Sequence, residues 1–212
     1  MGGRPMSPAP ARPPAREALA AARGRTIPDV LGVDLCVLFC GINPSLLSGL
    51  TGHHYARPGN RFWPALHLAG FTDRRLRPEE DATLPRYGLG CTNLVARATA
   101  RADELRRAEF EAGGERLRRL VGEWRPRCVA IVGIGAARLA FDLPQATIGP
   151  QALVLGGAPV WVLPSTSGLN AHHQLPELVG AFGALHQAFG QAIGKSSPVP
   201  DLERARDRHQ ER

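Results

Sequence analysis

The feature that most constrains the fold is a regular alternation between short apolar runs and longer stretches with helical periodicity. A short apolar run bounded by turn residues is typical of a strand buried on both faces. Strands that alternate with helices indicate an α/β three-layer sandwich with a mostly parallel central sheet. The apolar runs are residues 34–40 (DLCVLFC), 90–95, 127–133, 152–155 and 159–163 (PVWVL).

The stretches between these runs carry helix signals. Residues 61–69 follow an Asn that can cap a helix, and residues 78–84 begin with Pro followed by acidic side chains. Residues 103–124 place apolar side chains on a stripe with a period near 3.6, which Gly113 and Gly114 interrupt. Two more helices are predicted at residues 135–141 and 175–193.

The two ends of the chain differ in composition from its centre. Residues 1–26 are rich in Pro, Ala and Arg, with a short helix predicted at 16–22, and residues 195–212 are densely charged. Both ends are expected to be disordered, around one domain at residues 27–194. No apolar run approaches the roughly 20 residues that span a bilayer, and no signal-peptide core is visible. Membrane insertion and secretion are therefore not expected.

The positive charge is unevenly distributed. The formal net charge is +7 and the pI is near 10.2, which favours polyanionic partners without identifying one. Residues 1–26 alone contain five Arg and one Glu. Lys195 is the single lysine of the chain, so residues 27–194 contain no side-chain amine.

Metal and cofactor signals are weak. The four cysteines form no C-x-x-C pair, and the pairs His53-His54 and His172-His173 lack partners at metal-ligand spacing. The segment 133–138 (GIGAAR) lacks the third glycine of a dinucleotide-binding loop. Neither a metal nor another cofactor is expected.

Two polar loops directly follow predicted strands. They are residues 41–45 (GINPS) and 164–170 (PSTSGLN). Sheets of this class bind ligands at the carboxyl ends of their strands, so these loops are the candidate site. Each could also be an ordinary turn, since Asn-Pro and Ser-Gly are common turn pairs.

The first loop and the residues after it form a recognisable pattern. The stretch GINPSLLSGLTGHHYARPGNRFWPALHLAGFTDR resembles the mismatch-specific uracil/thymine DNA glycosylases of the uracil-DNA glycosylase superfamily. Those proteins carry a GINPG-type motif and then T-G-x-x-aromatic-A-x-P-x-N-R-F-W. The segments EAGGERLRRLVGEWRP and VWVLPSTSGL are also similar, so the resemblance covers about residues 30–190. It implies a uracil-DNA glycosylase-like fold.

The resemblance implies roles for the first loop and the aromatic residue. Asn43 would place the attacking water through its amide carbonyl, on a turn stiffened by Pro44. Tyr55 would stack on a base flipped out of the duplex, although a core tyrosine is the alternative. The backbone amides of Ile42 and Tyr55 would read the base edge and stabilise its developing negative charge.

Two further residues would contact the base. Ser48 would lie near the 5-position of a pyrimidine, where a small side chain could admit a methyl group. Asn93 stands late in a predicted strand where some relatives carry Lys. We hypothesise that its amide extends activity to uracil outside G mismatches, including single strands. A strand-end Asn that caps a turn is the alternative.

The second loop would enter the DNA. Ser167, Gly168 and Leu169 match the family's intercalating loop, with Leu169 as the wedge. This chain has Ser165-Thr166 where the family usually has Asn-Pro, which leaves loop support and recognition of the opposite guanine open. His172 and His173 are either DNA contacts or solvated loop residues. Arg57 and Arg61 are further candidates for DNA contacts.

The resemblance therefore implies a monofunctional DNA glycosylase in base excision repair. It would remove uracil, with thymine or modified cytosine as further substrates, from G·U or G·T mismatches in double-stranded DNA. The absence of lysine from residues 27–194 argues against a Schiff-base lyase step. The alternatives are a superfamily member that prefers deaminated purines or single-stranded uracil, and a catalytically weak lesion-binding module. A cytoplasmic, nucleoid-associated monomer is expected.

Overall fold

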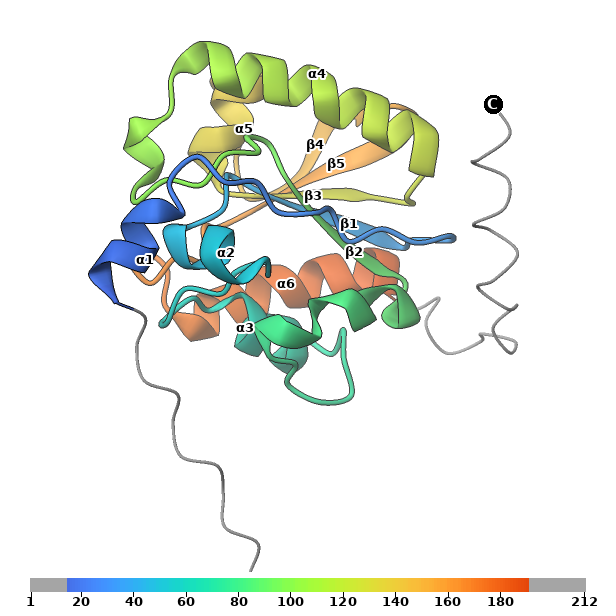
Figure 1. Ribbon diagram of the computed structural model, residues 1–212. Helices are drawn as coiled ribbons and strands as arrows, with labels where there is room; N and C mark the ends of the chain where they lie inside the picture. Colours follow the sequence, from blue (N-terminus) through green and yellow to red (C-terminus); the bar gives the residue numbers. More distant parts are fainter. Residues whose placement is uncertain (1–14, 191–212) are drawn as a thin grey trace, which may run out of the picture.

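The computed structural model describes residues 15–190, and a five-stranded sheet forms its centre (Figure 1). The strand order is β2-β1-β3-β5-β4; every neighbouring pair is parallel except β5 and the edge strand β4. This arrangement confirms the predicted α/β fold with a mostly parallel sheet. The strands are β1 (Val37–Gly41), β2 (Leu89–Asn93), β3 (Val129–Val132), β4 (Gly149–Leu155) and β5 (Ala158–Leu163).

Helices cover both faces of the sheet and complete the three layers (Figure 1). One face is covered by α4 (Arg107–Trp124) and α5 (Ile134–Phe141). The other is covered by α3 (Phe62–Leu68), the 3₁₀ helix η1 (Pro78–Tyr87) and α6 (Leu175–Phe189). Three short elements complete the fold: α1 (Arg16–Ala21), α2 (Leu46–Thr51), which the sequence pattern did not predict, and the 3₁₀ helix η2 (Ala102–Glu104).

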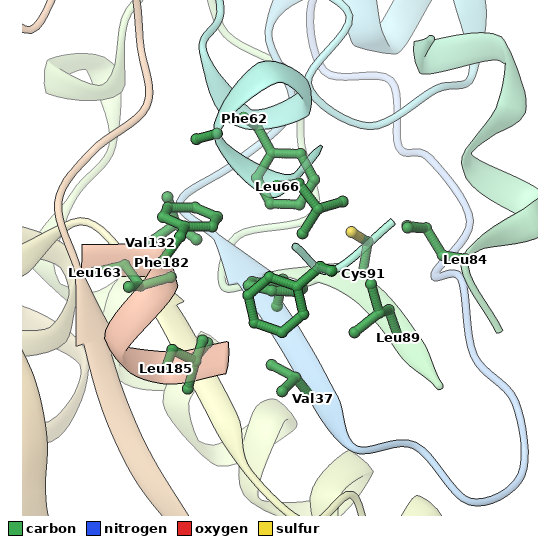
Figure 2. Packing of buried hydrophobic residues seen from close by; sticks show 14 of the residues in the cluster. Val37, Phe62, Leu66, Leu84, Leu89, Cys91, Val132, Leu163, Phe182 and Leu185 are labelled. Carbon is green, nitrogen blue, oxygen red and sulfur yellow. The ribbon is translucent and has the colours of Figure 1, made fainter. Parts of the chain in front are cut away.

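The central strands bury side chains on both faces, which explains their continuous apolar sequences. Phe39 of β1 faces α3 and α6, where its ring lies 5.3 Å from that of Phe62 and 5.8 Å from that of Phe182. Figure 2 shows this cluster, in which Leu66 and Leu185 also take part. Leu38 points to the other face and packs in a second cluster with α4 and α5.

The two glycines in α4 do not break the helix. They bring it close to its neighbours: a Cβ on Gly113 would lie 2.4 Å from the carbonyl oxygen of Leu94, and one on Gly114 would lie 2.5 Å from that of Ala140. Only glycine permits such approaches. The pair therefore seats α4 against α5 and against the loop that follows β2.

The expected boundary of the N-terminal arm differs from the structure. Residues 15–26 pack on the domain: Ala22 is fully buried, Gly24 donates a backbone hydrogen bond to Ala98 (2.9 Å), and Ala98 donates one to Arg25 (2.8 Å). These residues belong to the domain rather than to a disordered arm. Residues 1–14 and the expected tail at 195–212 lie outside the described residues.

Between residues 15 and 190, no helix has the length and apolar character needed to cross a membrane.

Candidate active site

A cavity of about 440 Å³ lies at the carboxyl ends of the parallel strands. Its walls come from the loop after β1, the turn around Tyr55, the loop after β2 and the loop after β5. The two predicted loops therefore do meet at one site. The predicted residues that line the cavity are Ile42, Asn43, Ser48, Tyr55, Arg57, Asn93, Ser167 and Leu169.

The amide of Asn43 is held in one orientation. Its Nδ2 donates to the hydroxyl of Thr99 (2.7 Å) and to the carbonyl oxygen of Arg97 (3.1 Å). The Thr99 hydroxyl donates its own proton to the carbonyl of Arg101 (2.7 Å), so toward Asn43 it can only accept. This chain of hydrogen bonds assigns the nitrogen of Asn43 to the protein and, among residues 15–190, leaves Oδ1 as its free acceptor.

The loop that carries Arg97 and Thr99 is itself anchored. The Arg97 guanidinium makes two hydrogen bonds to Glu109 near the start of α4, at 2.6 and 2.9 Å. These bonds lower the pKa of the Glu109 carboxyl to about 2. The backbone N–H of Thr99 also donates to the carbonyl of Pro44 (3.1 Å). The loops after β1 and β2 therefore form one connected floor.

Ser48 links this floor to the turn around Tyr55. Ser45 caps α2 by accepting a hydrogen bond from the backbone N–H of Ser48 (3.1 Å). The buried hydroxyl of Ser48 accepts one from the backbone N–H of Ala56 (3.2 Å). Ser48 thus lines the cavity and fixes its wall.

Tyr55 adopts a left-handed backbone conformation (φ 53°). Its ring stacks on Phe62, with centroids 3.8 Å apart and planes 11° apart, and it also lines the cavity. The ring thus makes the core contact of the alternative interpretation, while its stacking on a flipped base stays a prediction. Burial raises the pKa of the Tyr55 hydroxyl well above its usual value, so the phenol stays neutral.

Asn93 is the last residue of β2 and pairs in register with Gly41 of β1. Its Oδ1 lies beside Gly41, where an added Cβ would approach it to 2.6 Å. The Nδ2 atom faces Nδ1 of the buried His54 at 3.5 Å. His54 Nε2 donates to the carbonyl of Pro28 (3.0 Å), and burial lowers the pKa of His54. A neutral His54 therefore offers Nδ1 as an acceptor, which directs Asn93 Oδ1 toward Gly41.

Arg116 of α4 fixes the backbone of Asn93. The guanidinium of Arg116 donates to the Asn93 carbonyl (3.1 Å) and to the Thr92 hydroxyl (3.2 Å), and it forms an ion pair with Asp29. Thr92 also donates to Asp29 (2.6 Å). The end of β2 is thus fixed by charge-assisted bonds.

The loop after β5 places Leu169 at the surface, with 64% of the residue exposed. The loop is closed internally: Asn170 Nδ2 donates to the Ser165 carbonyl (2.9 Å), and the backbone N–H of Leu169 donates to the Ser167 hydroxyl (3.3 Å). Thr166 is buried. The Ser165 carbonyl and the buried Thr166 thus take part in the internal structure of the loop.

The four residues proposed as DNA contacts differ in their surroundings. Arg57 and His172 are exposed, and His173 is partly buried at the end of the loop. Arg61, expected as a DNA contact, has protein partners instead. Its guanidinium donates to the backbone carbonyls of Ser167 (2.6 Å), Asn170 (2.8 Å) and His173 (2.8 Å), so these donors already have partners.

Metal-binding geometry is not present in the part of the chain described: no three His, Cys, Asp or Glu side chains gather there. The cysteines are buried free thiols. Burial raises the pKa of Cys128 to about 12 and that of Cys91 well above its usual value, which makes both thiols unreactive. Gly133, in the incomplete dinucleotide-like segment, packs against Ile42.

Three residues of the site were not assigned their roles from sequence. Thr99 lies in the loop after β2. Ligands bind at the carboxyl ends of parallel strands, so the reasoning that selected the loops after β1 and β5 applies to this loop as well. His54 was considered only as a metal ligand. For Arg61 the sequence predicts a DNA contact. Its actual partners are backbone carbonyls, and a sequence pattern cannot reveal these.

Comparisons with known proteins identify the family of the chain and support its fold. The model of the family described as "Uracil DNA glycosylase superfamily" matches residues 28–185. The fold is also similar to the solution NMR structure of a candidate uracil DNA glycosylase from Methanosarcina acetivorans. That similarity has a TM-score of 0.51 and 23% identity, and it covers 77% of this chain and 98% of the other. With the family model matched over most of its length, the chain belongs to the uracil DNA glycosylase superfamily.

Proposed function

We propose that this protein is a monofunctional DNA glycosylase that hydrolyses the N-glycosidic bond of uracil mispaired with guanine. The observation that carries the proposal is the fixed amide of Asn43. Its nitrogen is bound to Thr99 and Arg97, and its oxygen is left as an acceptor at the cavity. Membership of the uracil DNA glycosylase superfamily supports this activity.

The chemistry requires little of Asn43 beyond placement. Breaking the glycosidic bond leaves positive charge on the sugar, and such a centre is attacked by water without prior deprotonation. A fixed carbonyl oxygen can orient that water, although an amide is a poor base. The reaction should therefore be slow compared with that of a relative carrying Asp at this place.

Base recognition follows from Asn93, Tyr55 and Ser48. The Oδ1 atom of Asn93 can accept the N3–H of uracil or thymine, and its second amide proton can reach a base carbonyl. The neutral ring of Tyr55 provides a stacking surface. Ser48 brings a small side chain to the cavity wall, which supports thymine and modified cytosine as further substrates.

The exposed Leu169 supports action on double-stranded DNA. A flipped base leaves a gap in the stack, and an apolar side chain can fill it. Arg57 at the cavity rim and His172 beside the loop would contact the DNA backbone.

The lack of a lyase step is part of the proposal. Residues 27–194 contain no lysine, and Lys195 lies outside the described residues. The abasic product should stay intact until alkali or heat is applied. Strand nicking without either, retained in Lys195→Ala, would show that the product is cleaved by another amine.

The test uses labelled DNA with G·U, G·T, A·U, G·hypoxanthine or single-stranded U, followed by alkaline cleavage of abasic sites. Wild type should act on G·U, whereas Asn43→Ala should bind the same DNA and lose most of its activity. Gln151→Ala, which removes an amide from the edge strand β4, should match wild type. Preference for hypoxanthine would favour the deaminated-purine alternative, and binding without cleavage of any DNA would favour a lesion-binding module.

Asn93 tests the breadth of the activity. We propose that its amide allows excision from single strands and from pairs other than G·U. Asn93→Ala should then lower the ratio of single-strand to G·U activity, and an unchanged ratio would leave only the turn-capping role.

A further inference from the structure

Two segments that are far apart in sequence lie against each other at the exposed edge of the cavity. The backbone N–H of Arg61 donates to the carbonyl of Thr166 (2.9 Å). A Cβ on Gly168 would lie 2.8 Å from the carbonyl oxygen of Gly59, so the two backbones are nearly in van der Waals contact. The segment before α3 is therefore the support on which the loop 165–173 rests.

The Arg61 side chain joins the two segments more firmly. Its Nη2 donates to the carbonyls of Ser167 (2.6 Å) and Asn170 (2.8 Å), and its Nη1 donates to the carbonyl of His173 (2.8 Å). Nη1 also reaches the side-chain oxygen of Gln174 (3.2 Å). These acceptors lie before, within and after the turn that presents Leu169, so a single guanidinium spans the whole loop.

The anchor of this contact is rigid. Arg61 directly precedes α3, whose Phe62 is fully buried between the rings of Phe39 and Tyr55. The Asn60 side chain accepts a hydrogen bond from the Phe62 backbone N–H (2.9 Å) and fixes the start of the helix. Within residues 15–190, Arg61 forms no ion pair with a carboxylate, and its charge is balanced by carbonyl dipoles of the loop.

We propose that Arg61 is a positioning residue that holds the loop 165–173 in the conformation needed to insert Leu169 into duplex DNA. This inference rests on the proposed glycosylase function. Leu169 is largely exposed and its loop contributes little to the core, so without Arg61 the loop would sample other conformations. Lysine would replace Arg61 poorly, because a single ammonium cannot bond several carbonyls with a planar fork.

The inference makes a specific prediction about substrates. A wedge is needed only where a base must be extracted from a stacked duplex. Loss of Arg61 should therefore reduce activity on G·U duplexes and spare activity on single-stranded uracil. Simple destabilisation of the domain would reduce both activities alike.

The first experiment measures amide hydrogen exchange in the free protein. Exchange in residues 165–173 should accelerate in Arg61→Ala, accelerate less in Arg61→Lys, and stay unchanged in Arg119→Ala, which removes an exposed arginine from α4. Exchange in α6 should stay slow in all variants. Unchanged loop exchange in Arg61→Ala would overturn the inference.

The second experiment measures kcat/KM on a G·U duplex and on single-stranded uracil DNA. Arg61→Ala should lose up to about 30-fold on the duplex, no more than removal of the wedge itself, because it acts only through the placement of Leu169, and it should keep its single-strand activity. Arg61→Lys, the milder change, should show the same pattern with a smaller loss. Adding Arg61→Ala to Leu169→Ala should cause little further loss. Equal losses on both substrates would contradict a positioning role.

If wild type cleaves neither DNA, the proposed function fails, while the exchange experiment still decides whether Arg61 holds the loop.

Discussion

The loops after β1 and β5 sit at the same edge of the sheet but are built differently. The first, with Asn43, lies on the cavity floor and is hydrogen-bonded to the loop after β2 through Thr99 and Arg97. The second projects Leu169 into solvent and is held by one side chain, Arg61, from another segment. Neither loop is fixed by its own strand alone. In the proposed mechanism, bond cleavage and DNA engagement would therefore depend on separate supports.

This separation has a physical basis. In the proposed mechanism the floor must keep an amide oxygen in place relative to the reacting sugar, which favours buried hydrogen bonds that water cannot replace. The wedge loop must meet a large solvated surface, so it stays exposed. A group that acts on the floor should matter for every substrate, whereas a group that acts through the wedge should matter for duplexes only.

The strongest test of the floor is Asn43→Ala. The variant loses the oxygen proposed to orient water, and its rate should fall on the order of 10²–10³-fold on duplex and single-stranded substrates alike. Single-turnover rates on both substrates measure this. A loss restricted to the duplex would place Asn43 with the wedge and remove the distinction between the two loops.

The strongest test of the wedge is Leu169→Ala. Unstacking a base costs a few kcal/mol, and each 1.4 kcal/mol corresponds to a tenfold change, so kcat/KM on a G·U duplex should fall about 30-fold. Single-strand activity should stay at the wild-type level, and so should the thermal midpoint, because the side chain is exposed. Comparable losses on single strands would mean that Leu169 contacts the base or the sugar instead.

A smaller effect is expected from Thr99→Val. The valine has a similar shape but cannot accept the hydrogen bond from Asn43 Nδ2. A net contribution of about 1 kcal/mol for one hydrogen bond predicts a fivefold to tenfold fall in kcat, at roughly equal size on both substrates and with KM little changed. Thr99→Ser keeps the hydroxyl and should restore most of kcat. Equal losses in the two variants would show that retaining the hydroxyl is not enough, so that the hydrogen bond is not the main contribution of Thr99.

The same contrast explains what the sequence could predict. Strand periodicity placed Asn43 and Leu169 at one edge, because carboxyl ends of parallel strands share an edge whatever the side-chain details. The supports were not predictable in this way. Thr99 acts through a hydroxyl that faces a distant loop, and Arg61 acts on backbone carbonyls. Both depend on tertiary contacts, across 56 residues for Thr99 and 106 for Arg61, which periodicity does not encode.

Residues 15–26 and α2 show a related limit. The composition of the first segment is that of a disordered arm, yet Ala22 is fully buried and Arg25 bonds to Ala98. Small residues give little hydrophobic signal in a sequence but pack closely against a glycine such as Gly49. The short α2 contains Gly49 and is followed by Gly52, so its sequence gives little helix signal, and its stability comes from the Ser45 cap and from packing.

The smallest expected effect concerns His54, which lies in the turn that Ser48 links to the floor. Burial lowers its folded-state pKa below the usual 6.5, with Asp81, Asp29 and His53 as its charged or titratable neighbours. As the pH falls below about 6.5, the unfolded chain gains a proton that the folded protein resists, so the free energy of unfolding should decrease. His54→Gln, which cannot take up that proton, should show a flatter stability profile between pH 7 and 5.

Thermal or urea unfolding of both proteins across this range measures the difference. The carboxylates provide an internal control, because arginine neighbours lower the pKa of Glu80 and Glu109 from 4.5 to about 2. Their contribution is present above pH 4.5 and is lost as the pH falls toward 2, in both wild type and His54→Gln. Identical slopes for the two proteins between pH 7 and 5 would contradict a neutral, buried His54. The orientation that His54 gives to Asn93 would then need another cause, since only the neutral ring can offer Nδ1 as an acceptor while Nε2 donates to Pro28.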